Sequence, residues 1–197
     1  MTKLAVIYYS ATGHGTKMAA EIERAAQAVG AEVRVRHIAE TVDPSVFADN
    51  PAWSANYEAT KDLPAATGDD IVWADAVIFG SPTRYANVTG SFQSFIDTLG
   101  GLWAQGKLAN KVYAAYTSSQ TAHGGQESTL LALHTTFVHL GGIIVAPGYT
   151  DPLKFVDGNP YGASKVTGES SELDDTDRDA LDHLVTRAIG VAQKLTA

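Results

Sequence analysis

Three stretches of this chain are apolar on both faces, and each is followed at once by a polar segment rich in small residues. They span residues 4–9, 76–81 and 112–117. An apolar run of this length, without alternating polar residues, is typical of a strand covered on both sides, and such strands belong to parallel sheets. The chain is therefore expected to place helices on both faces of a sheet.

The intervening segments predict the rest of the architecture. Apolar residues at helical spacing predict helices over residues 16–29, 92–99, 127–140 and from Asp174 or Asp175 to 195. Further strands are expected at residues 32–37 and 143–145. This alternation is typical of a doubly wound α/β fold. We expect a single domain over residues 1–197, a three-layer αβα structure whose five parallel strands follow the flavodoxin-like order 2-1-3-4-5.

Two long segments lack such periodicity. Residues 38–68 are broken by three prolines, and residues 147–171 are rich in Gly, Pro, Asn and Tyr. Structureless loops of this length are unusual in a compact domain, so the first segment either contains short helices or is a functional excursion. Trp53 and Tyr57 are the aromatic side chains expected to anchor it.

Composition excludes several classes of protein. The formal net charge is −8, whereas a nucleic-acid-binding domain presents a basic face. The chain has no cysteine, which excludes disulfides, thiol catalysis and thiolate metal sites, and its His, Asp and Glu residues show no metal-site spacing. No apolar run approaches the ~20 residues of a membrane span, and no signal segment precedes the first strand. We expect a cytoplasmic protein without nucleic-acid, membrane or metal partners.

The segment after the first apolar run, residues 10–16, has the features of a phosphate cradle. It leads from a strand into a helix, where free backbone N–H groups and the helix dipole attract an anion. Gly13 and Gly15 allow the backbone to curl tightly. The candidate hydroxyl donors are Ser10, Thr12 and Thr16. The alternative is an ordinary strand-to-helix turn with a capping residue.

Sequence spacing narrows the choice of phosphate ligand. A dinucleotide fingerprint needs a third glycine, which the Gly13-His14-Gly15 segment lacks, and an acid after the second strand, where His37 stands. Lys17 does not have the spacing of a P-loop lysine. The ends of the first and third strands also lack the acidic cluster of a phospho-receiver. A lysine-free loop of hydroxyls suits a monophosphate dianion, and FMN fits that description.

Two more polar loops are expected at the same edge of the sheet. Residues 81–87 and 117–125 follow the third and fourth strands, as residues 10–16 follow the first. Ligands of doubly wound sheets bind outside the carboxyl ends of the strands. Three converging loops can hold a phosphate, a polyol and a flat ring together, which favours a flavin nucleotide.

Five segments together carry a family resemblance. They are YYSATGH (8–14), FGSPTRY (79–85), GGLW (100–103), GGQE (124–127) and PYG (160–162). In this order and spacing they resemble the WrbA-type (type IV) NAD(P)H:quinone oxidoreductases, which are flavodoxin-like FMN flavoproteins. The similarity runs over nearly the whole chain.

The resemblance implies roles for individual residues. The FMN phosphate would bind to Ser10, Ala11, Thr12, Gly13, His14 and Gly15. The ribityl chain and one ring edge would contact Pro82, Thr83, Arg84 and Tyr85. The other side of the ring would contact Ser119, Gln120, Thr121, Ala122, His123 and Gly124. His139 would be a further FMN contact, Thr12 a contact for the nicotinamide cofactor, and Trp103 would lie over the flavin at the substrate position.

By the same resemblance the chain is an enzyme, an FMN-dependent NAD(P)H dehydrogenase (quinone). It would use NADH or NADPH as co-substrate and reduce quinones by two electrons, through hydride transfer by way of FMN. Because FMN carries the chemistry, no catalytic side chain is expected. The family forms homotetramers, and a dimer is the alternative. Two other functions stay open: a flavodoxin-type one-electron carrier and a flavin-free regulatory binding module.

The predicted helix over residues 127–140 has histidines on opposite faces. His134 falls beside Leu133 and Phe137 on the helical wheel, so it is expected in the core. His139 points nearly the opposite way. A residue so placed can reach the site of a neighbouring subunit, which is our hypothesis for His139.

Overall fold

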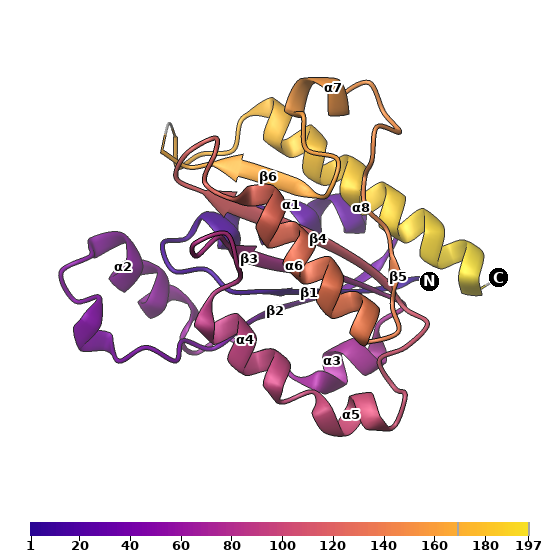
Figure 1. Ribbon diagram of the computed structural model, residues 1–197, viewed down its shortest axis with the longest axis horizontal. Helices are drawn as coiled ribbons and strands as arrows, with labels where there is room; N and C mark the ends of the chain where they lie inside the picture. Colours follow the sequence, from indigo (N-terminus) through magenta and orange to yellow (C-terminus); the bar gives the residue numbers. More distant parts are fainter. Residues whose placement is uncertain (169, 197) are drawn as a thin grey trace.

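The computed structural model describes residues 1–168 and 170–196, and its centre is a parallel sheet (Figure 1). The strands of its main path are β1 (Lys3–Tyr8), β2 (Glu32–His37), β3 (Ala76–Pro82), β4 (Val112–Ser119) and β5 (Ile143–Ile144). Their order is β2-β1-β3-β4-β5, and every neighbouring pair is parallel. The flavodoxin-like order expected from the sequence is confirmed.

The central strands are apolar throughout because each face of the sheet packs against a separate core. In β1, Leu4 and Val6 belong to one buried cluster, while the intervening Ala5 and Ile7 belong to the other. All four side chains are fully buried. This double burial is what the uninterrupted apolar runs indicated.

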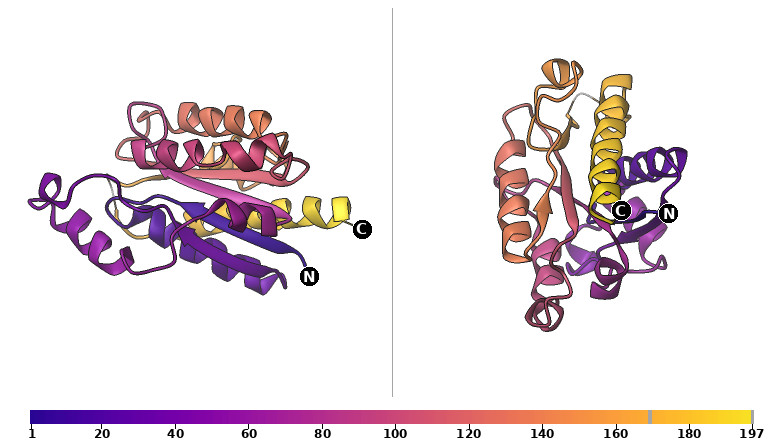
Figure 2. Two further views of the ribbon diagram at one scale, coloured as in Figure 1. Left: turned by 90° about the horizontal axis from the view of Figure 1, so that it is seen from below. Right: turned by 90° about the vertical axis from the view of Figure 1, so that its right-hand side faces the viewer.

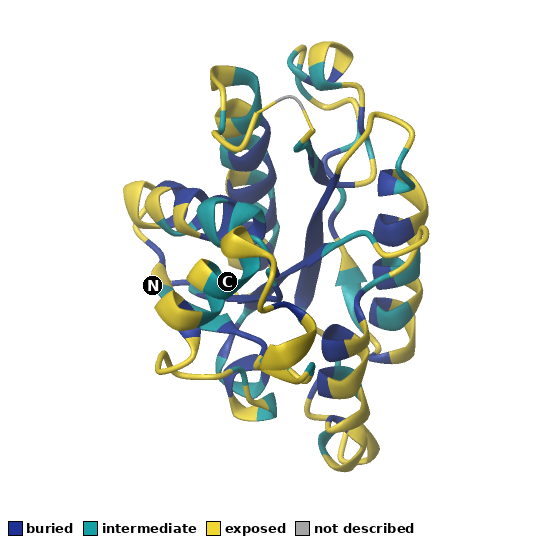
Figure 3. Ribbon diagram, turned by 90° about the vertical axis from the view of Figure 1, so that its left-hand side faces the viewer, coloured by how far each residue is buried: buried dark blue, intermediate teal, exposed yellow. Residues whose placement is uncertain are grey.

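Helices on both sides of the sheet complete these cores (Figure 2). One face is covered by α1 (His14–Ala28) and α8 (Asp175–Thr196). The other is covered by α3 (Gly68–Trp73), α4 (Gly90–Asp97) and α6 (Gln126–His139), with the short α5 (Gly100–Ala104) following α4. Figure 3 shows the result, with buried strands in the middle and helices exposed on their outer sides.

Residues 38–68 contain short helices, which was the first of the two alternatives. The segment forms a 3-10 helix, η1 (Pro44–Val46), and α2 (Pro51–Thr60), each with a capping side chain and a proline in its first turn. Phe47 lies between them and stacks on Trp53, with ring centroids 4.9 Å apart. The ring of Tyr57 also packs on Phe47, with ring centroids 5.4 Å apart. The two expected anchors therefore meet around a buried phenylalanine.

The last strand of the sheet is interrupted. β5 pairs with the start of β4, and a further strand, β6 (Ala163–Val166), pairs in parallel with the end of β4. The residues between them contain α7 (Lys154–Asp157) and lie outside the sheet (Figure 1). The sequence analysis did not predict β6, because its four residues include Ser164 and Lys165 and do not form an apolar run.

A close contact between β3 and β4 allows a tyrosine side chain to link the sheet to α1. Gly80 pairs with Tyr116, and a Cβ built on Gly80 would lie 2.1 Å from Tyr116 Cζ. The Tyr116 hydroxyl donates to the Gly15 carbonyl in α1 at 3.0 Å. Burial raises the pKa of this phenol, which keeps it protonated as a donor. Glycine at position 80 therefore leaves the room for a link between the sheet and α1.

Gly80→Ala is expected to lower the free energy of unfolding by roughly 3 kcal/mol, because the new methyl group overlaps the Tyr116 ring. Gly190→Ala is the matched control, since a Cβ on this α8 residue meets nothing within 4 Å. That variant is expected to gain up to about 1 kcal/mol from helix propensity. Urea denaturation measures both, and a Gly80→Ala protein as stable as the wild type would contradict this packing.

Candidate functional site

A cavity of about 760 Å³ lies at the carboxyl edge of the sheet, within the usual volume range of small-molecule sites. The loops after β1, β3 and β4 line it, so the expected convergence of these loops is observed. The lining residues at the ends of these strands and in the segments directly after them are Ser10, Ala11, Thr12, His14, Gly15, Pro82, Thr83, Arg84, Ser118, Ser119, Gln120, Thr121 and Gly124.

The first loop has the geometry of an anion cradle. Gly13 ends it in the left-handed conformation, with φ +89°, and α1 begins at His14. The first hydrogen bond of the helix runs from Lys17 N to the Gly13 carbonyl at 3.0 Å, so the N–H groups just before it have no acceptor within the helix. The first turn of α1 contains no acidic residue. The positive end of this helix is thus directed at the cavity without a neutralising carboxylate.

The hydroxyls of this loop have different roles. Ser10 Oγ accepts from Gly13 N at 3.1 Å, which leaves its own hydrogen available to a ligand. Thr12 lines the cavity. The hydroxyl of Thr16, the third candidate donor, donates to Asn56 Oδ1 in α2 at 2.9 Å. Short helices in residues 38–68 were one of the two alternatives, but the sequence did not indicate that one of them would contact the cradle.

His14 contributes no positive charge to the cradle. Burial, assisted by Lys17, lowers the pKa of His14 below its ordinary value, so its imidazole is neutral at pH 7. A neutral imidazole offers one N–H donor and one acceptor. The loop is therefore suited to bind an anion through N–H and O–H dipoles.

Hydrogen bonds of Thr83 connect the loops after β3 and β4. Thr83 N donates to the Ser118 carbonyl at 2.9 Å, and its hydroxyl donates to the Gly124 carbonyl at 3.3 Å. The Thr129 hydroxyl of α6 donates in turn to Thr83 Oγ1 at 2.9 Å. These contacts hold the two loops at a defined separation across the cavity.

The loop after β3 ends in a tight two-residue turn. Arg84 and Asn87 exchange backbone hydrogen bonds of 2.7 and 3.0 Å. Between them, Tyr85 and Ala86 have positive φ angles of 51° and 65°, an uncommon conformation for residues with a side chain. Tyr85 is fully exposed at the tip of this turn.

Both excursions also contribute to the cavity wall. Asn50 and Ala52 come from the first, and Thr167 and Gly168 from the second. Thr167 N donates to the Ser119 carbonyl at 2.8 Å and Gly168 N to the Gln120 carbonyl at 3.0 Å, which extends the β4–β6 pairing into the loop. The sequence analysis missed these four residues because neither excursion has a periodic pattern. Ser118 was also missed, although it stands in the polar segment that was singled out.

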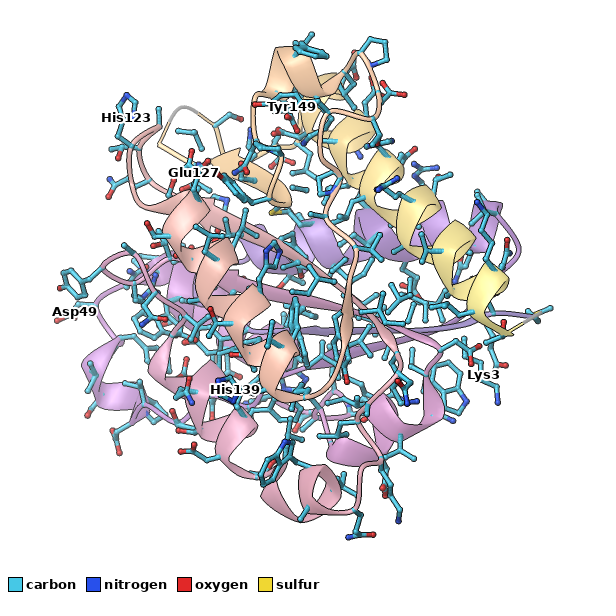
Figure 4. The ribbon with its side chains drawn as sticks, turned by 45° about the vertical axis from the view of Figure 1, so that its right-hand side comes forward. Lys3, Asp49, His123, Glu127, His139 and Tyr149 are labelled. Carbon is cyan, nitrogen blue, oxygen red and sulfur yellow. The ribbon has the colours of Figure 1, made fainter. Side chains whose placement is uncertain are left out.

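Some predicted cofactor residues do not line the cavity. Gly13 shapes the cradle through its backbone, whereas Tyr85, Ala122 and His123 are exposed on the loops around it. Figure 4 shows His123 extending from its loop into solvent.

Trp103 and His139 lie away from this cavity. α6 starts beside it and ends at His139, about 20 Å further along the helix axis. Figure 4 shows Glu127 and His139 near opposite ends of α6. Trp103 Nε1 donates to the His139 carbonyl at 2.7 Å, and both residues line a separate cavity of about 300 Å³ between α4, α5 and α6. His134 lies beside Phe137 on the inner side of α6, as expected, with ring centroids 5.9 Å apart.

Within residues 1–168 and 170–196, no group of three or more His, Asp or Glu side chains is arranged to hold a metal ion. No helix of this part of the chain is long and apolar enough to cross a bilayer.

Comparison with known sequences gives consistent matches. The sequence model of the NADPH-dependent FMN reductase family matches residues 2–151. A protein of Deinococcus radiodurans is 48% identical over 194 residues, which are 98% of this chain and 96% of that protein. One of Geotalea daltonii is 43% identical over 183 residues, which are 90% of this chain and 89% of that protein. Both relatives are named NAD(P)H dehydrogenase (quinone).

Solved structures agree with the fold. A flavodoxin, WrbA-like protein from Agrobacterium tumefaciens has a TM-score of 0.69 at 22% identity, over 98% of this chain and 99% of that one. A flavodoxin from the domain Archaea has a TM-score of 0.63 at 18% identity, over the full length of both chains. At these identities the likeness concerns the fold alone.

The sheet order, the two helical layers and the cavity at the carboxyl edge define a flavodoxin-like α/β protein. The chain belongs to the NADPH-dependent FMN reductase family. The resemblance drawn from five short sequence segments is thereby confirmed.

Two glycines at opposite ends of α1 provide a test of the cradle. Gly13 and Gly30 both have positive φ, +89° and +78°, so alanine is expected to lower stability by about 1–2 kcal/mol at either position. Only Gly13 belongs to the cradle. Gly13→Ala is expected to weaken FMN binding by about tenfold or more, and Gly30→Ala to leave it within about twofold. Fluorescence titration with FMN measures both variants, and equal affinities would count against the cradle.

Proposed function

We propose that this protein is an FMN-dependent NAD(P)H:quinone oxidoreductase. The observation that carries the proposal is the convergence of three loops on one cavity, where a helix N-terminus without an acidic residue meets two polar loops. Such a site suits a ligand with a phosphate at one end and a flat polar ring at the other. The relatives named NAD(P)H dehydrogenase (quinone) support the reaction.

Each loop would hold one part of FMN. The cradle of residues 10–15 binds the phosphate through backbone N–H groups and the Ser10 hydroxyl. Residues 82–85 and 119–124 flank the remainder of the cofactor. The Thr83 hydrogen bonds hold these two loops at a fixed separation on either side of the cofactor.

When bound, FMN supplies a ring that takes a hydride from NADH or NADPH and reduces a quinone by two electrons. The residues of this chain bind and orient; none is assigned a covalent step. Thr12, on the cavity wall next to the cradle, is the proposed contact for the nicotinamide cofactor.

The Trp103–His139 pair is proposed to complete the site of a neighbouring subunit in a homotetramer. Trp103 is 55% exposed in the single chain and borders an apolar cavity together with Leu99 and Leu140. Its indole is oriented by the hydrogen bond to the His139 carbonyl. An exposed, oriented indole far from its own FMN cavity is suited to cover the flavin ring of another copy.

The enzymatic activity can be tested directly. FMN-loaded protein is expected to oxidise NADH or NADPH in the presence of benzoquinone, measured as the loss of nicotinamide absorbance. Ser10→Glu, which places a carboxylate in the cradle, is expected to abolish FMN binding and this turnover together. A yellow, FMN-loaded protein without turnover above that of free FMN would refute the enzyme assignment and favour a one-electron carrier.

Mixing two variants, each of which is expected to lose turnover by itself, tests whether sites are shared between subunits. Trp103→Ala removes the proposed ring cover, and Ser10→Glu removes the cradle. Oligomers assembled from both are expected to regain about a quarter of wild-type turnover, because that share of sites combines an intact cradle with an intact neighbouring Trp103. Activity that stays at the level of the unmixed variants would refute shared sites, and size-exclusion chromatography establishes the oligomer.

A further inference from the structure

One side chain of the segment 38–68 reaches the cradle: Asn56 of α2. Its Nδ2 donates to the Ser10 carbonyl at 2.7 Å, and its Oδ1 accepts from Thr16 Oγ1 at 2.9 Å. The two partners are 46 and 40 residues away along the chain, so these contacts are tertiary. A single amide thus spans the loop from its first residue to the first turn of α1.

The orientation of this amide follows from its partners. A backbone carbonyl only accepts hydrogen bonds, so the atom that faces the Ser10 carbonyl must be the Nδ2 donor. Oδ1 then faces Thr16, whose hydroxyl supplies the hydrogen. A side chain without an amide at position 56 would lose both contacts at once.

The contact with Ser10 also directs a backbone donor. In a trans peptide the C=O and the following N–H point in opposite directions. Because the Ser10 carbonyl is bound towards α2, the N–H of Ala11 points away from α2. Ala11 lies on the wall of the large cavity. Asn56 therefore influences a donor that it does not touch.

α2 is itself held in place by a partly buried carboxylate, that of Glu40. This group accepts from Tyr9 OH at 2.5 Å and from Trp53 Nε1 at 2.9 Å, which joins the end of β1 to α2. Burial acts to raise the pKa of Glu40, but hydrogen bonds from Tyr9, Val42, Trp53 and Thr41 outweigh it and hold the pKa below its ordinary value. Glu40 is therefore charged at neutral pH and fixes the helix that carries Asn56.

We propose that Asn56 is a positioning residue for the phosphate of FMN, and that through Ser10 and Thr16 it gives the site its preference for FMN over riboflavin. The inference rests on the proposed function, because it requires that the cradle receives FMN. Asn56 does not line the large cavity, so it acts through the loop and not by contact with the phosphate.

The test compares the dissociation constants of FMN and riboflavin, measured by quenching of flavin fluorescence on titration with apoprotein. For Asn56→Ala the Kd of FMN is expected to rise about tenfold, the effect of two lost hydrogen bonds, while that of riboflavin stays within about twofold. The ratio of the two constants is the deciding quantity, because a general loss of stability would not change it.

Ser54→Ala is the matched control. Ser54 belongs to the same helix and donates to the Phe47 carbonyl at 3.1 Å, without contact with the cradle. Like Asn56→Ala, this substitution removes a hydrogen bond from a side chain of α2 to a backbone carbonyl outside the helix. Both dissociation constants of this variant are expected to stay within about twofold of the wild type.

Thr16→Val gives a second and independent measurement. It keeps the shape of the side chain but removes the hydroxyl that binds Asn56 Oδ1. If Thr16 acts through Asn56, the effects on FMN affinity are not additive, and the double variant binds FMN no more weakly than Asn56→Ala. Additive losses would show that Thr16 acts separately and would overturn the inference.

The remaining outcomes separate the two proposals. An Asn56→Ala protein that binds FMN like the wild type, or that loses FMN and riboflavin equally, overturns the positioning role and leaves the proposed function standing. A wild-type protein that binds no FMN overturns both. If Asn56→Ala does not fold, an unchanged FMN affinity in Thr16→Val overturns the inference, and a loss confined to FMN supports it.

Discussion

Burial of β1, β3 and β4 on both faces determines where this chain can place polar groups. Side chains such as Ile7, Ile78 and Ala114 are fully covered, so hydrogen-bonding groups collect where the strands end. Because the strands are parallel, their carboxyl ends share one edge, and three polar loops meet there. The cavity is thus a consequence of the sheet as much as of the loop sequences.

The parts of the fold that could be predicted from the sequence are those that repeat a pattern. The apolar runs identified β1, β3 and β4, and helical spacing identified α1 and α6. α2 and β6 could not be placed in the same way. α2 is held by Glu40, whose partner Tyr9 is 31 residues away, and β6 by backbone pairing with β4. Polar contacts between distant residues leave no periodic signal.

The same distinction applies to the site. Loop residues such as Ser10, Thr83 and Ser119 follow predictable strands, so their convergence could be inferred. From the two excursions, Gly168 contacts the Gln120 carbonyl through its backbone N–H and Asn56 contacts the Ser10 carbonyl through its side-chain amide, and no local motif marks either residue. Trp103 and His139 were singled out by resemblance and by the helical wheel, yet their own chain places them apart from its cavity. A role for them depends on assembly, which the pattern within one chain does not encode.

The interrupted edge strand has a consequence for how such a protein can change. β5 and β6 pair with different parts of β4. Residues 145–162 therefore leave the sheet and return to it, and the length of this stretch does not set the register in which either strand pairs with β4. Insertions at exposed positions of this stretch, such as Tyr149 or Gly158, add only a small loop-closure penalty. Evolution, or a protein engineer grafting a recognition peptide, can therefore remodel that outer surface while the strand that follows keeps the ligand pocket aligned.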